Sequence, residues 1–179
     1  HKFMGTFYGN GHVISNVSIS QSGTNSVGIF GVTGNTARIL DLGVENATVS
    51  GKDYTGVIVG NSAGTITNCY VKGNVNVNGN SYVGAITGQA TNTIASSYTS
   101  GNININGSGY VGGLAGYIIN SVRNSFVQDV NVTSSSGKAG GFTGAFGSTA
   151  SYDKISIKGT INVSGTNCIG GYVGSSDIS

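Results

Sequence analysis

The sequence predicts an all-β fold, a parallel β-helix or β-solenoid of about six turns with three short strands in each turn. Three observations predict it. Gly, Asn, Ser and Thr dominate the composition, the apolar residues are mainly Val and Ile, and one motif recurs along most of the chain at intervals of roughly 28 to 29 residues. An all-β sandwich is the alternative fold, but a sandwich does not require identical residues at a constant period.

The composition argues against helices and against two classes of partner. Charged residues make up 8% of the chain, against roughly 25% in typical soluble domains. Gly, Asn, Ser and Thr are poor residues for a helix interior, whereas Val and Ile favour strands. The net charge is only +2 and the eight Lys and Arg residues are scattered, so we expect no nucleic-acid partner. No apolar stretch approaches the ~20 residues of a membrane span, so we expect no membrane insertion.

Aligning the chain on the glycine of a Tyr-Val-Gly motif divides it into repeats. The predicted blocks are residues 26–53, 54–81, 82–109, 110–138 and 139–167. A diverged first turn precedes them at 1–25, and a truncated last turn follows at 168–179. Nothing interrupts the series, so we expect residues 1–179 to form a single solenoid domain that is a fragment of a larger protein.

The first strand-like stretch of each block contributes one glycine and then an apolar residue. The glycines are Gly28, Gly56, Gly84, Gly112, Gly141 and Gly170. The following positions are Phe30, Ile58, Ile86 and Leu114 and, less regularly, Thr143 and Tyr172. A glycine in every turn implies a shared backbone requirement. Either φ is positive there, or the chain bends where a Cβ would clash.

The middle stretch contributes an aliphatic residue and then an aromatic one in three successive blocks. The aliphatic residues are Ile66, Ile94 and Val122, and the aromatic residues are Tyr70, Tyr98 and Phe126. Short β-like stretches of this kind cannot bury their apolar faces alone, so we expect successive turns to stack in parallel at ~4.8 Å.

The third stretch alternates apolar and small polar residues, as in NVNVNG from Asn74. In a strand, alternation sends one set of side chains to the interior. That set is Val75 and Val77, Ile103 and Ile105, Val130 and Val132, and Ile161 and Val163. The opposite face carries one asparagine column, made of Asn76, Asn104, Asn131 and Asn162.

No residue pattern supports catalysis, a metal site or a cofactor. The H-E-x-x-H arrangement of zinc peptidases is absent. Asp41 and Glu45 lie close together, but no carboxylate recurs in one column, so we interpret them as surface charges. Cys69 and Cys168 sit more than three turns apart, which is too far for a disulfide bond, and we expect two small buried thiols. We therefore predict no catalytic, metal-binding or cofactor-binding residue.

Two columns are candidate binding surfaces, and each also has a structural interpretation. Tyr54, Tyr82 and Tyr110 share one column. Outward-facing rings would stack on sugars, whereas rings at a corner would form an aromatic ladder that seals the core edge. The asparagine column would bind ice or a crystalline glycan, or its amides would satisfy one another along the stack. We favour the structural interpretation of both columns.

Several segments resemble the bacterial GLUG-motif repeats. They are YVGGLAG at Tyr110, TGVIVG at Thr55 and TITNCYVKGNV at Thr65. The opening FMGTFYGNGHVISNVSI also looks like the segment that leads into such repeats, with Tyr8 where that pattern has Asp. The resemblance covers nearly the whole chain. It implies a secreted or cell-surface bacterial origin, because such repeats occur in surface proteins and in the non-catalytic N-terminal region of immunoglobulin A-specific zinc metallopeptidases.

The resemblance and the residues together lead to ranked hypotheses. The first is a non-catalytic structural or adhesive segment of a surface protein, an adhesin for example, that spaces neighbouring domains of the same polypeptide and contacts host glycoprotein or glycan. The second is an ancillary region that positions the substrate of an immunoglobulin A-type metallopeptidase. A polysaccharide-active or ice-binding β-helix is the remote third.

Overall fold

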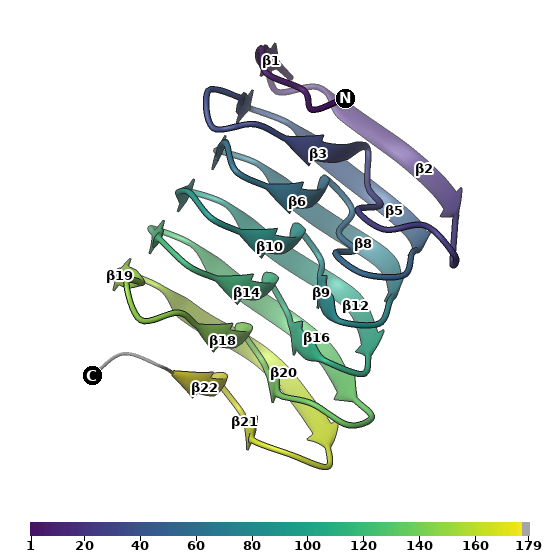
Figure 1. Cartoon of the computed structure of the whole chain (residues 1–179), viewed down its shortest axis with the longest axis vertical. Helices are drawn as coiled ribbons and strands as arrows, with labels where there is room; N and C mark the ends of the chain where they lie inside the picture. Colours follow the sequence, from purple (N-terminus) through teal and green to yellow (C-terminus); the bar gives the residue numbers. More distant parts are fainter. Residues whose placement is uncertain (177–179) are drawn as a thin grey trace.

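The chain winds through the same three faces in every turn and forms a six-turn solenoid (Figure 1). The computed structural model describes residues 1–176. These residues contain strands and turns but no helix, and every strand pairing among them is parallel. The all-β parallel solenoid with three strands per turn is therefore confirmed. The last three residues of the truncated turn predicted at 168–179 lie outside the described part.

Each face is a six-stranded sheet with one strand from each turn. Face 1 contains β1 (Thr6–Tyr8), β4 (Arg38–Leu40), β7 (Thr65–Thr67), β11 (Ile94–Ala95), β15 (Ser121–Arg123) and β19 (Ser151–Asp153). Face 2 contains the longest strands, β2 (Val13–Ser20), β5 (Gly43–Ser50), β8 (Tyr70–Asn78), β12 (Tyr98–Gly107), β16 (Phe126–Ser134) and β20 (Ser156–Gly165). Face 3 contains β3 (Phe30–Thr33), β6 (Val59–Ser62), β10 (Thr87–Ala90), β14 (Ala115–Ile118), β18 (Thr143–Phe146) and β22 (Val173–Ser176).

A short four-stranded ribbon joins face 2 to face 3. It contains β9 (Tyr82–Gly84), β13 (Tyr110–Gly112), β17 (Ala139–Gly140) and β21 (Ile169–Gly170). Isolated bridges extend it toward the first turns, through Val27, Thr55 and Val83.

The alternation in face 2 places the predicted apolar columns in the interior. Ile103 pairs with Val75 and Val130, and Ile105 pairs with Val77 and Val132. All of these side chains are essentially inaccessible to solvent. Full burial of one Val or Ile side chain stabilises a fold by about 1.5 to 3 kcal/mol. A continuous stack of such residues is therefore the main stabilising feature of the solenoid.

The corner before face 2 is built from one residue with positive φ and one buried residue after it. The positive-φ residues are Asp41, Asn68, Ser96, Asn124 and Lys154. Asn and Asp tolerate this conformation better than most side chains. Ser97 is the buried residue that follows Ser96. Its hydroxyl donates to the carbonyl of Ala95 at 2.8 Å and accepts the backbone N–H of Cys69 at 3.1 Å. Ser125 accepts the N–H of Ser97 in the same way at 3.2 Å, so these two serines of one corner column tie three successive corners together.

Cys69 occupies the same column, but Cys168 does not. Burial raises the pKa of the Cys69 thiol to about 11, and its Sγ lies 3.3 Å from the carbonyl oxygen of Thr67. Both cysteines are free, as expected. The predicted burial of Cys168 is wrong, because it lies in the last turn at a positive-φ corner position and is exposed.

Two expectations about strands and register are also wrong. The aromatic residues of the middle stretch belong to the start of the long face 2 strands, because the chain turns the corner at Asn68 and Cys69. In the ribbon, Gly112 pairs with Gly140 rather than with Gly141. Lys138 therefore follows Tyr110 in the tyrosine column, and the repeat begins at 138 instead of 139.

The glycine column exists because neighbouring turns approach closely. Positive φ occurs at other glycines and not in this column. A Cβ built on Gly56 would lie 2.5 Å from the Cα of Thr87 in the next turn. Of the two explanations for this column, close approach is therefore correct.

Candidate functional site

The tyrosine column forms a ladder of parallel rings where face 2 meets the ribbon. The ring centroids of Tyr54 and Tyr82 lie 4.8 Å apart at an interplanar angle of 4°, and those of Tyr82 and Tyr110 lie 5.2 Å apart at 2°. The ammonium of Lys138 lies 5.2 Å from the centroid of Tyr110. Offset stacking and a cation over the last ring both stabilise such a ladder.

Stacking limits what this column can bind. Tyr82 has a tyrosine over each face, and Tyr110 has Tyr82 on one side and Lys138 on the other. A sugar ring needs a free aromatic face, and in this column only Tyr54 has a ring face that no other ring or lysine of the ladder covers. Burial raises the pKa of Tyr82, and the neighbouring Tyr54 and Tyr110 raise it further.

A second aromatic ladder of the same length runs along face 2. The rings of Tyr70 and Tyr98 lie 5.2 Å apart, and those of Tyr98 and Phe126 lie 4.7 Å apart, nearly parallel in both pairs. The ammonium of Lys158 sits 4.1 Å above Phe126. Both ladders therefore contain three rings and end at a lysine on the side of the C-terminal turns.

The asparagine column forms a continuous hydrogen-bonded ladder. Each Nδ2 donates to the Oδ1 of the preceding turn, from Asn104 to Asn76 at 3.3 Å, from Asn131 to Asn104 at 3.0 Å and from Asn162 to Asn131 at 2.8 Å. The flanking Asn106 donates to Asn78 in the same way. The side chains predicted as a candidate binding surface thus use much of their hydrogen-bonding capacity on one another.

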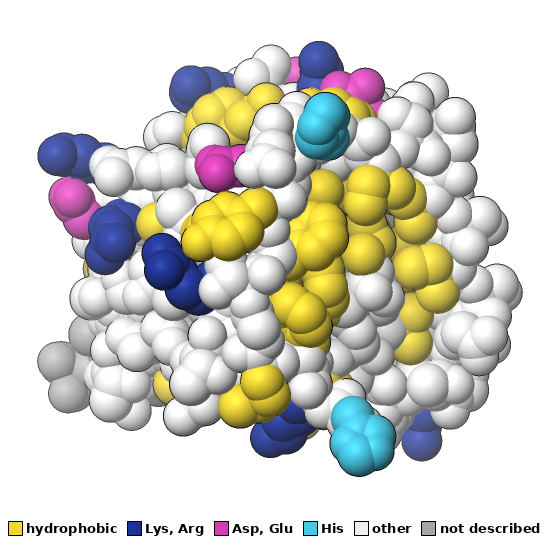
Figure 2. All heavy atoms as spheres, turned by 90° about the horizontal axis from the view of Figure 1, so that it is seen from above, with side chains coloured by type: hydrophobic (Ala, Val, Ile, Leu, Met, Phe, Trp, Pro, Cys, Tyr) yellow, Lys and Arg dark blue, Asp and Glu magenta, His cyan; other side chains and the backbone are white. Residues whose placement is uncertain are grey.

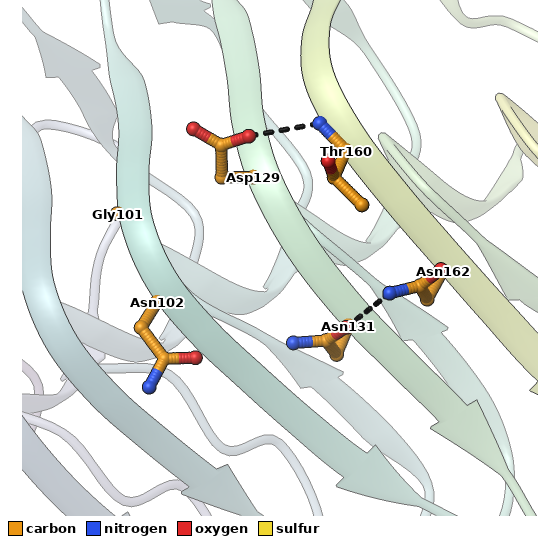
Figure 3. A pocket seen from close by; sticks show the side chains of 6 residues that line it. All are labelled: Gly101, Asn102, Asp129, Asn131, Thr160 and Asn162. Atoms are coloured by element: carbon orange, nitrogen blue, oxygen red, sulfur yellow. Dashed lines mark hydrogen bonds between the residues drawn. The ribbon is translucent and has the colours of Figure 1, made fainter.

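A hollow of about 360 Å³ interrupts this face. Its lining residues come from three neighbouring strands, β12, β16 and β20, and are Gly101, Asn102, Asp129, Asn131, Thr160 and Asn162 (Figure 3). The Asp129 carboxylate accepts the backbone N–H of Thr160 at 2.8 Å and the side-chain amide of Gln128 at 3.1 Å. The only carboxylate in the hollow therefore already has two hydrogen-bond donors.

A difference in strand length explains why an aspartate stands at this position. Between paired segments, β12 has Gly101 and Asn102 where β16 has only Asp129. The same shift occurs where β5 has only Asn46 against Gly73 and Asn74 of β8. The side-chain oxygen of Asn46 accepts the N–H of Asn74 at 3.0 Å, just as Asp129 accepts that of Thr160. In each shorter strand the side chain thus supplies an acceptor where a backbone residue is missing.

Sequence reasoning missed this bulge column, although the sequence contains a signal for it. One residue in each turn of face 2 has positive φ, and these residues are Asn16, Asn46, Gly73, Gly101, Asp129 and Gly159. Gly, Asn and Asp are the residue types that adopt this conformation most readily. Recurrence of these three types near the middle of each face 2 strand therefore predicts one positive-φ residue per turn, with a register shift where adjacent strands differ in length at that point.

The other ionisable residues do not converge on a site. Within residues 1–176, no group of three or more His, Cys, Asp or Glu side chains is placed to hold a metal ion. Asp41 accepts the side-chain amide of Asn68 at 2.6 Å, which ties two adjacent corners together. A membrane-spanning helix is likewise absent from the described residues.

A solved structure shares this fold. It is a protein from Bacteroides ovatus that is provisionally named an immunoglobulin A1 protease, with a TM-score of 0.57 over 94% of this chain and 58% of that one. The two sequences are 22% identical, so the likeness concerns the fold alone.

In sequence, 74 residues of the chain, or 41% of it, are 46% identical to halomucin from Haloquadratum walsbyi (strain DSM 16790 / HBSQ001). The match spans 1% of the length of halomucin. No family model matches the chain, so its resemblance to GLUG-motif repeats stays a prediction.

Proposed function

We propose that this chain is a non-catalytic structural segment of a secreted or cell-surface bacterial protein. Its solenoid spaces or presents neighbouring domains of the same polypeptide. The proposal rests on one observation: the recurring polar and aromatic side chains contact one another along the stack. Asn104, Asn131, Tyr82 and Tyr110 have their principal contacts with equivalent residues of adjacent turns. Contacts of this kind hold adjacent turns at a constant spacing, so the number of turns sets the length of the segment.

Two similarities support a surface location. Halomucin bears the name of a mucin, and the structural neighbour bears that of an immunoglobulin A1 protease. Both are longer than the matched part of this chain, which fits a repeat segment within a larger protein. An adhesive role toward host glycoprotein or glycan would fall to Tyr54, at the end of the tyrosine ladder, and to the hollow beside Asp129.

A second candidate is an ancillary region of an immunoglobulin A-type metallopeptidase. The fold shared with the Bacteroides ovatus protein over 94% of this chain favours it. In that role the solenoid would position the substrate for a catalytic domain elsewhere in the polypeptide. Binding of immunoglobulin A1 by this chain, without cleavage, would favour this candidate over a pure spacer.

Removal of one complete repeat tests the spacer proposal. Because Tyr54 and Tyr110 both stack on Tyr82 in the same register, deletion of residues 82–109 should join equivalent positions and leave a five-turn solenoid. With a fluorescent domain fused to each end, energy transfer should report a separation shorter by ~4.8 Å, the spacing of adjacent strands. An unfolded deletion variant, or an unchanged separation, would contradict the proposal.

The non-catalytic part of the proposal needs its own test. The chain is incubated with immunoglobulin A1 and with a panel of polysaccharides, and the products are analysed by mass spectrometry. We expect no cleavage. Cleavage by the native chain that disappears in Asp129→Asn would overturn the proposal, because Asn46 shows that an amide fills the structural role of Asp129.

A further inference from the structure

The hollow on face 2 lies where β16 is one residue shorter than both of its neighbours. Between paired positions, β16 has only Asp129, whereas β12 has Gly101 and Asn102. On the other side, β20 has Gly159 and Thr160 opposite Asp129. Asn102 and Thr160 therefore have no counterpart in the strand between them, and they stand two strand spacings apart, about 9.6 Å. Figure 3 shows Asn102 on one side of the hollow and Thr160 on the other.

This arrangement occurs once among the described strands of face 2. β5 is also one residue shorter than β8, but it pairs with β2 without a shift and so has a longer neighbour on one side alone. The side-chain oxygen of Asn46 in β5 accepts the N–H of Asn74, as Asp129 accepts that of Thr160. An amide is thus sufficient for this backbone contact. The negative charge of Asp129 is not needed for it and is available to a ligand.

The side chains around the hollow keep hydrogen-bonding capacity of both kinds. An ionised carboxylate accepts about four hydrogen bonds, and Asp129 accepts one from Thr160 and one from Gln128. An asparagine amide has two N–H donors and two acceptor lone pairs. Asn131 donates one N–H and accepts one hydrogen bond within the asparagine ladder, which leaves it one donor and one lone pair. Charged acceptors and amide donors lie side by side here, and this mixture matches the hydroxyl groups of a polyol.

The volume and the lining of the hollow suit a polar organic molecule. Its 360 Å³ is far more than one water molecule or one ion needs. It falls at the lower end of the range of small-molecule sites, roughly 300 to 1,000 Å³. The six lining residues include no aromatic or aliphatic side chain. The hollow therefore favours a ligand with many hydroxyl groups over a metal ion and over an apolar molecule.

The charges around the hollow favour a neutral ligand. Asp129 and Lys158 are the charged residues of β12, β16 and β20, so the formal charges of these three strands cancel. Viewed along the stack, the molecule shows hydrophobic side chains at the centre of the turn and scattered charged side chains around a mainly uncharged rim (Figure 2). Neither anions nor cations are therefore strongly attracted to this part of the surface.

We propose that the hollow binds one sugar residue of a neutral glycan. Two neighbouring hydroxyl groups of the sugar donate to the Asp129 carboxylate, and the remaining N–H groups of Asn102 and Asn131 donate to sugar oxygens. This inference rests on the adhesive role proposed above and names its ligand. A few hydrogen bonds in an open hollow give weak binding, so we expect a Kd on the order of 1 mM.

An NMR titration of the nitrogen-15-labelled chain tests the proposal. The probes are maltotriose, mannotriose and galactotriose. At least one of them should shift the side-chain amides of Asn102 and Asn131 and the backbone N–H of Thr160 in a saturable way. The side-chain amide of Asn35, which is exposed elsewhere, should stay unchanged. Trigalacturonate, a trisaccharide with carboxylates, should bind several-fold more weakly than galactotriose, because its charge is repelled by Asp129.

A pair of variants separates the charge from the structural role. Asp129→Asn keeps a side-chain oxygen for the N–H of Thr160 and removes the charge. We expect it to raise the Kd about tenfold, because hydrogen bonds to a charged acceptor are stronger than those to a neutral one. Asn46→Asp is the matched control. It places a carboxylate at the equivalent position of β5, where a second wall is missing, and should leave the Kd unchanged.

Three results would overturn the proposal. The first is the absence of a saturable shift with all three neutral trisaccharides at tens of millimolar. The second is an equal Kd for Asp129→Asn and the native chain. The third is a shift of the same signals with calcium chloride alone, which would identify a cation site. Failure of glycan binding together with the expected shortening in the repeat deletion would reject this inference and leave the spacer proposal standing.

Discussion

Thr55 is a polar residue in a buried column whose other members are apolar. Val27 and Val83 flank it in the adjacent turns. The Thr55 side chain is fully buried, and its Oγ1 has no hydrogen-bond partner. A buried hydroxyl without a partner costs roughly 1 to 3 kcal/mol, and Val has nearly the same shape.

We therefore expect Thr55→Val to raise the free energy of unfolding by about 1 kcal/mol, as measured by urea denaturation. Thr87→Val is the matched control. Thr87 is equally buried, but its hydroxyl donates to the carbonyl of Gln89 at 3.0 Å. This control should be neutral or destabilising. Equal stabilisation by both substitutions would show that the missing partner is not the cause.

The two cysteines should differ sharply in reactivity. The raised pKa and burial of Cys69 keep it protonated and inaccessible, whereas Cys168 is exposed. Iodoacetamide at pH 8 should label Cys168 within minutes and leave Cys69 unlabelled until the protein unfolds. Peptide mass spectrometry gives the readout. Labelling of both at the same rate in the native protein would contradict the account of the buried corner column.

At the scale of elements, the tyrosine ladder makes the free energy of unfolding fall as the pH becomes alkaline. A free tyrosine has a pKa of about 10, and in the folded chain burial and the adjacent tyrosines raise that of Tyr82. The contribution of Tyr82 is therefore fully present below about pH 10 and is lost as the pH rises through its folded value. Ionisation there would place a partly desolvated charge beside Tyr54 and Tyr110.

Tyr82→Phe should keep the stacking and remove this ionisation. We expect its free energy of unfolding, measured by urea denaturation from pH 8 to pH 11, to fall less steeply than that of the native chain. Tyr8→Phe, at a residue that is 59% exposed, serves as the control and should leave the pH dependence unchanged. Identical pH profiles for all three chains would refute the raised pKa of Tyr82.

The strands of face 2 could be predicted because two signals agree there. Alternation fixes which side chains point inward, and the repeat period fixes which residues share a column, so Val75 and Ile103 were placed correctly. The corners were harder to predict. The aromatic residue that begins β8 looked like the end of the middle stretch, because Asn68 and Cys69 do not resemble a conventional turn.

Register in the fifth turn could not be predicted for a different reason. Gly140 and Gly141 are adjacent, so the repeat aligns about equally well on either one. Only the pairing of Val111 with Ala139 decides between them. The hollow at Asp129 also could not be predicted from the sequence, because it depends on a one-residue difference in length between β12 and β16.

At the scale of the whole molecule, the recurring polar columns help the apolar core to hold adjacent turns together. Each turn contacts mainly its neighbours, so stability is distributed along the stack. The asparagine ladder is the clearest instance, because the same side chains would otherwise be free to bind a ligand. A direct measurement of their hydrogen bonds therefore separates the two roles.

Hydrogen exchange of side-chain amides, followed by NMR on nitrogen-15-labelled protein, provides this measurement. Asn104 donates to Asn76 and Asn102, and Asn131 donates to Asn104, whereas Asn35 is exposed and has no such partner. We predict that the Nδ2 protons of Asn104 and Asn131 exchange at least several-fold more slowly than those of Asn35. Equal exchange rates at all three residues would contradict the claim that this face is a structural ladder.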